Sequence, residues 1–93
     1  MAEERKPSEI DFYTFIVSLG SSAFVHLGDA PHPETRKVEP NLLLAKQTID
    51  ILGMLQEKTR GNLTPEEQKV LQALLSDLRL RFVTRSSEPA PDR

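Results

Sequence analysis

The chain has 93 residues, with 12 Lys and Arg against 14 Asp and Glu, a net charge of −2 and no cysteine. This balance excludes a strongly basic nucleic-acid-binding domain, and the missing thiols exclude disulfides and cysteine metal sites. We expect a flexible leader at 1–7, a single helical domain at 8–84 and a disordered tail at 85–93. A domain of this size builds a marginal core, so we expect oligomerisation to complete it.

The segment 10–27, IDFYTFIVSLGSSAFVHL, is the most apolar of the chain and predicts a helix at about residues 9–27. Two starts are open. Ser8 and Asp11 have the spacing of a capping box, and Asp11 could itself be the N-cap. Gly28 is a typical residue to end the helix.

On a helical wheel, one face of this first helix is apolar, and Tyr13, Val17 and Phe24 widen it. The rest of the surface carries small hydroxyl residues in place of charges. Such a helix is normally buried on several sides, which favours a contact with another chain. The residues that we assign to an oligomer interface are Phe12, Phe15, Ile16, Leu19, Ser22 and Ala23.

A second helix is predicted at about residues 40–60, with Pro40 in its first turn and Gly61 after its end. Gly53 lies within it and costs about 1 kcal/mol against alanine, which either a close contact or tolerance would explain. Its apolar positions cover about half of the helix circumference. They are Leu42, Leu44, Ala45, Thr48, Ile49, Ile51, Leu52 and Leu55.

A third helix is predicted at about residues 65–83, and its start is the clearest local signal in the sequence. Thr64 is the expected N-cap, Pro65 occupies the first helical position, and Glu67 completes a capping box. The core face is compact and consists of Val70, Leu71, Leu74, Leu75, Leu78 and Phe82.

These elements predict an all-α fold of three helices, assembled as a helical-bundle homo-oligomer. The short connection after residue 60 favours an antiparallel hairpin of the second and third helices. The first helix would pack into this hairpin and across a two-fold axis, because closed symmetric dimers are the commonest oligomers. We therefore expect a homodimer.

Three runs of the chain resemble a known family. The runs SLGSSAFVHLG, AKQTIDILGMLQEKTRGNLTPEE and DLRLRFV, within residues 10–83, are similar to domain of unknown function family 1844. The resemblance implies a small bacterial, cytoplasmic, all-helical protein. It implies no activity and supplies no catalytic residue.

One cluster has the residue types of metal ligands, namely His26, Asp29, His32 and Glu34. His26 and Asp29 are three apart at a helix end, and His32 could fold back through the proline turn. The spacing matches no established motif, so a hydrogen-bonded histidine near a helix C-terminus is the preferred interpretation. We expect no cofactor and no catalytic constellation.

The strongest basic feature is the group Arg79, Arg81 and Arg85 near the end of the third helix. Asp77 can pair with Arg81 four residues later, which removes part of the charge. Only one aromatic residue, Phe82, lies among these arginines, whereas several are interleaved in many RNA-binding surfaces. Apolar residues outside the expected core indicate a second packing surface for a protein partner. These are Leu43, Met54, Leu80 and Val83.

The sequence thus predicts a small non-enzymatic protein that self-associates and serves in interaction or scaffolding. An RNA- or ribosome-associated role of Arg79, Arg81 and Arg85 is the alternative. A metal-dependent activity at His26 and His32 is a second alternative. We expect no membrane span, because the first helix contains Asp11, His26 and several hydroxyl groups.

Overall fold

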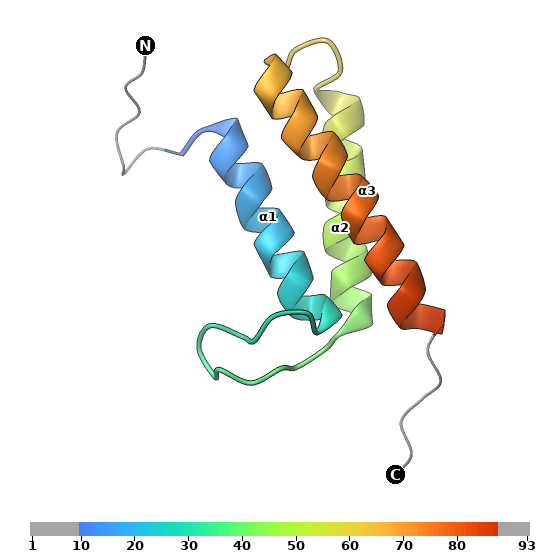
Figure 1. Ribbon diagram of the computed structural model, residues 1–93. Coiled ribbons are helices and arrows are strands. Elements are labelled where there is room, and N and C mark those ends of the chain that lie inside the picture. The colour runs from blue at the N-terminus through green and yellow to red at the C-terminus, as the bar shows by residue number, and fades with distance from the viewer. Residues whose placement is uncertain (1–9, 88–93) are drawn as a thin grey trace.

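The computed structural model describes residues 10–87 and consists of three helices without a strand in that range. They are α1 (Phe12–Leu27), α2 (Leu42–Lys58) and α3 (Pro65–Ser87). The predicted all-α class with three helices is confirmed. In Figure 1, α2 rises to a short connection, α3 descends from it, and α1 lies beside both.

The starts of α1 and α2 are set by side-chain caps. Asp11 is the N-cap of α1, and its carboxylate accepts a hydrogen bond from the Thr14 N–H at 2.8 Å. The predicted start at residue 9 was therefore wrong, and the alternative start at Asp11 is confirmed. α2 begins after Asn41 rather than at residue 40, because the Asn41 side chain caps the Leu44 N–H.

The start of α3 follows the prediction in detail. The Glu67 N–H donates to Thr64 Oγ1 at 3.1 Å, and the Thr64 N–H donates to Glu67 Oε1 at 2.8 Å. This reciprocal pair is a capping box, and Pro65 is the first helical residue. The sequence of this turn is sufficient to specify it, since every partner lies within three residues.

The far end of α3 differs from the prediction. The helix continues to Ser87, so residues 85–87 belong to it and not to the expected disordered tail. Arg81 and Arg85 contact Asp29 in the loop after α1, which attaches the last turns of α3 to the rest of the fold. The predicted leader at 1–7 and the tail from residue 88 lie outside the described residues.

One core joins the three helices. Its buried members are Ile16, Ala23, Leu27, Ala45, Ile49, Leu52, Leu71, Leu75 and Leu78. Gly20 is buried where α1 approaches α3, and a Cβ built on it would lie only 2.9 Å from Leu74 Cδ2. All six residues predicted for the core face of α3 are buried or half-buried.

Candidate functional site

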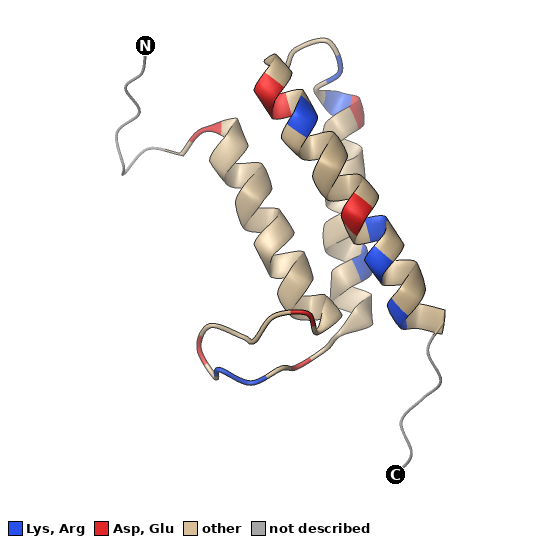
Figure 2. Cartoon of the chain, in the orientation of Figure 1, with Lys and Arg blue, Asp and Glu red and all other residues tan. Residues whose placement is uncertain are grey.

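The first candidate surface lies on α1, whose 16 residues include no Lys, Arg, Asp or Glu. Figure 2 shows this helix in tan along its whole length, whereas α3 carries red and blue turns. Tyr13, Phe15 and Val17 remain 39–41% exposed. The helix therefore presents more apolar surface than the subunit core covers.

The six residues predicted for an oligomer interface occupy three environments. Ile16 and Ala23 are fully buried in the core of the subunit, whereas Phe15 and Ser22 are exposed. The half-buried members are Phe12 and Leu19. The side chains of Ile16 and Ala23 are therefore used in the core of the subunit and are not available at its surface.

Three residues that helical periodicity assigns to the core are exposed in the structure. Phe15 is 41% exposed, and Leu44 and Ile51 are each 40% exposed. The apolar arcs of α1 and α2 are wider than the strip that three-helix packing covers. Other apolar residues that were expected outside the core are more exposed still: Leu43, Met54, Leu80 and Val83.

The second candidate is the arginine group, which the structure divides between two sides of α3. Arg81 donates to Asp29 at 2.9 Å and to Asp77 at 3.1 Å, and Arg85 pairs with the same Asp29 carboxylate. Arg79 points the other way, because a Cβ built on Gly53 of α2 would lie 2.9 Å from its Nη2. The three guanidinium groups do not form one basic surface.

Asp29 is the centre of this cluster, whereas its residue type and spacing had indicated only a candidate metal ligand. Its side chain is 14% exposed, and the hydrogen bond from Arg85, with the one from Arg81, lowers its pKa below the usual 3.8. Arg81 also stacks over the Phe24 ring, 4.9 Å from the centroid. Residues 52 and 56 positions apart in sequence make this cluster, so periodicity could not reveal it.

The metal-ligand residues do not assemble. Within residues 10–87, no three His, Asp or Glu side chains form a group that could hold a metal ion. Asp29 is bound to the arginines, and His32 Nδ1 accepts a hydrogen bond from the Glu34 N–H at 3.1 Å. His26 and His32 do share an open hollow of about 200 Å³, which is also lined by Ser21, Ser22, Val25 and Pro33.

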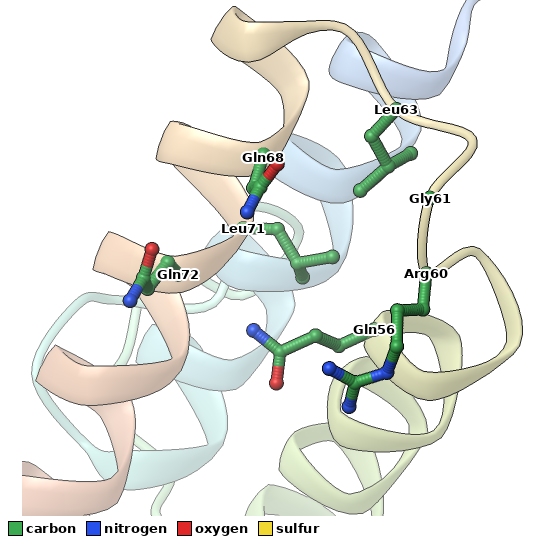
Figure 3. A pocket seen from close by; sticks show the side chains of 7 residues that line it. All are labelled: Gln56, Arg60, Gly61, Leu63, Gln68, Leu71 and Gln72. Atoms are coloured by element: carbon green, nitrogen blue, oxygen red, sulfur yellow. The ribbon is translucent and has the colours of Figure 1, made fainter.

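A further hollow of about 230 Å³ lies under the connection between α2 and α3 (Figure 3). Three glutamines line it, Gln56 from α2 and Gln68 and Gln72 from α3, around the apolar side chains of Leu63 and Leu71. Arg60 is at its edge, but its guanidinium donates to Glu57 at 2.6 Å. These glutamines are not among the residues predicted for a site. They offer hydrogen bonds and no nucleophile or general base.

None of the described helices is long and apolar enough to cross a membrane. No curated protein and no solved structure matches the chain. Residues 9–84 match the family model for a domain of unknown function, DUF1844, which includes all three helices except the last turn of α3. The chain therefore belongs to the DUF1844 family.

Proposed function

We propose that the protein is a small, non-enzymatic interaction and scaffolding protein that self-associates through α1. The observation that carries the proposal is the combination of an uncharged helix with three exposed apolar side chains, Tyr13, Phe15 and Val17. Exposed apolar surface is unfavourable in water, and its burial against another protein contributes roughly 25 cal/mol per Å². We place the protein in the bacterial cytoplasm, as the family resemblance implies.

In the proposed assembly, α2 and α3 act as an antiparallel hairpin, and α1 packs into it and lies near a two-fold axis. A closed dimer of this kind contains six helices and places the same residues of both copies at the contact. Ile16 and Ala23 hold α1 in its own subunit. The contact between copies therefore uses the outer parts of α1.

One observation, the pairing of Arg81 and Arg85 with Asp29, favours this proposal over both alternatives. An RNA-binding role needs free positive charge, and Arg81 and Arg85 both pair with Asp29. A metal-dependent role needs a group of ligands, and the same pairs occupy the Asp29 carboxylate. Self-association requires only that exposed apolar side chains become buried against a second copy.

The test is the solution mass of the chain, measured by light scattering after size exclusion over a concentration series. We expect a reversible rise from the 10.5 kDa chain mass to twice that value as the concentration increases. A folded chain that stays at the monomer mass up to millimolar concentration would contradict the proposal. A salt series would separate an apolar contact, which salt does not weaken, from a charged one.

A further inference from the structure

The exposed apolar residues Phe15, Leu44 and Ile51 lie on one side of the molecule, turned away from α3. On α1, the direction of α3 is marked by Phe24, since Arg81 of α3 stacks over its ring. Phe15 precedes Phe24 by nine positions, which places it about 180° around the helix. Ser22 follows Phe15 by seven positions and lies in the same row.

The same geometry holds on α2. Gly53 marks the direction of α3, because the Arg79 guanidinium lies next to it. Leu44 precedes Gly53 by nine positions and therefore lies on the opposite side, about 180° around the helix. Ile51 is seven positions after Leu44, in the same row. Since α1 and α2 pack directly against each other, these two rows make one surface, which we call the α1–α2 face: Phe15, Ser22, Leu44 and Ile51.

Charge separates the α1–α2 face from the opposite side of α1. Where α1 meets α3, the cluster of Asp29, Asp77 and Arg81 lines the surface. Along the row of α2 that includes Leu44 and Ile51, the intervening residues Gln47 and Thr48 are uncharged, and the first charge in that row is Lys58, in the last turn of the helix. Lys46 and Asp50 pair with each other at 2.8 Å, and both lie on the α3 side of that row. The four residues of the face carry no charge, so they offer a charged partner no electrostatic complementarity and meet the same residues of a second copy without repulsion.

The dimensions of the face fit a second copy. α1 and α2 have 16 and 17 residues, so both are about 25 Å long at 1.5 Å per residue. Two helices, each about 10 Å across, give a footprint of about 500 Å² per copy. Two copies then bury about 1,000 Å², which is the lower limit for a specific protein interface. One helix alone reaches about half of that area, so both helices are needed.

We propose that the α1–α2 face docks the α1–α2 face of a second copy, so that four helices form the contact and α3 lies outside it. This inference rests on the proposed self-association and adds its location. Phe15, Leu44 and Ile51 are then buried in the dimer. Their burial explains why the apolar arcs of α1 and α2 are wider than the strip that packing within the subunit covers. Tyr13 and Val17 lie on the other side of α1 and stay exposed, so Phe15 is the one of the three exposed apolar side chains of α1 that this contact buries.

The test compares lysine substitutions on the two sides of the molecule. Phe15→Lys and Ile51→Lys place charges in the proposed contact, and Tyr13→Lys is the matched control, because Tyr13 and Phe15 are both 41% exposed on the same helix. We expect dimerisation to weaken by more than about tenfold in Phe15→Lys and Ile51→Lys, since like charges would meet across the axis. Light scattering measures the mass, and circular dichroism with thermal melting verifies that each variant folds.

The outcomes distinguish the two proposals. A monomeric wild-type chain at every concentration would overturn both. If the wild type is a dimer, two results would overturn the α1–α2 face and leave self-association in place. One is that Ile51→Lys keeps the dimer mass. The other is that Tyr13→Lys loses the dimer to the same extent as the variants on the face. A Leu80→Lys variant on α3, at a residue that is 67% exposed, provides a second control and should remain dimeric.

Cysteine labelling gives an independent readout that does not depend on adding a charge. The chain has no native cysteine, so Ser22→Cys on the face and Ser76→Cys on α3 each introduce a single thiol with a small change in volume. We expect maleimide to label Ser22→Cys at least about fivefold more slowly in the dimer than after dilution to the monomer. The rate for Ser76→Cys should not change with concentration. Equal rates for Ser22→Cys at both concentrations, with a dimer present, would overturn the assignment of the face.

Discussion

α1 and α3 both contribute a row of buried residues to the same core, but they differ in what they present to solvent. α3 begins with Glu66 and Glu67 in its first turn and ends with Arg85 in its last turn, so its charges match the helix dipole. α1 has no acidic residue in its first turn and, within its span, only His26 in its last turn. α3 is therefore suited to water on its outer side, whereas α1 depends on what packs around it.

Two helices of one small domain are thus stabilised by different interactions. α3 combines local signals, namely the Thr64 capping box and the pair of Asp77 with Arg81, with a narrow apolar row. α1 has local caps at Asp11 and at Gly28, but it lacks charged side chains between them and relies on burial. Substitutions should therefore affect α1 through packing and α3 through charges and caps.

The largest effect is expected from truncation of the buried side of α1. Ile16 is fully buried, so Ile16→Ala should reduce the free energy of unfolding by about 2–5 kcal/mol through lost apolar burial and a cavity. Leu80→Ala on the exposed side of α3 should change it by less than about 0.5 kcal/mol. Urea unfolding at one protein concentration measures both. Equal losses would contradict the placement of the core.

A smaller effect is expected from the attachment of α3 to the loop after α1. Asp29→Asn removes a carboxylate that accepts hydrogen bonds from Arg81 and Arg85, and it should cost about 1 kcal/mol at pH 7, since both arginines are partly exposed. Because the folded state lowers the pKa of Asp29, the stabilisation is complete above the unfolded pKa near 3.8 and is lost as the pH falls through the lower folded value.

The measurement for Asp29→Asn is the difference in unfolding free energy from wild type at pH 7 and at pH 2–3. The difference should shrink at the lower pH, because the Asp29 carboxylate is protonated there in the unfolded chain, and it should vanish once the pH falls below the lowered pKa of the folded state. High salt should reduce it as well. A difference that stays constant over this range would show that the carboxylate acts through its shape rather than its charge.

The smallest effect distinguishes the two mid-helix glycines. Gly20→Ala adds a Cβ 2.9 Å from Leu74 Cδ2 in the packed contact of α1 with α3, and we expect a net loss of about 1 kcal/mol. Gly53→Ala adds a Cβ near the end of the Arg79 side chain, which can move at small cost. The gain in helix propensity then dominates, and we expect stabilisation of up to about 1 kcal/mol. Thermal melts should shift in opposite directions. An upward shift in Gly20→Ala would contradict the close approach of α1 and α3, and a downward shift in Gly53→Ala would contradict the free movement of the Arg79 side chain.

The helix signals that could be read from the sequence are those whose partners lie within one turn. Thr64 and Glu67 are three residues apart, and the rows that include Leu71, Leu75 and Leu78 follow the period of a helix. The start of α1 was ambiguous because Ser8 and Asp11 are both suitable caps. The end of α3 was placed too early because its last turns are attached by Asp29, which is more than 50 positions away in sequence.

The sequence by itself determined the class of the fold, the number of helices and the capping box of α3, because these depend on helical periodicity and on neighbours within a turn. Only the tertiary structure decided that Ile16 and Ala23 belong to the subunit core, while Phe15, Leu44 and Ile51 stay exposed. It also decided that Asp29 serves as an anchor for arginines. The physical reason is that a wheel shows which residues are apolar, whereas the covered width of each helix depends on where its neighbours pack.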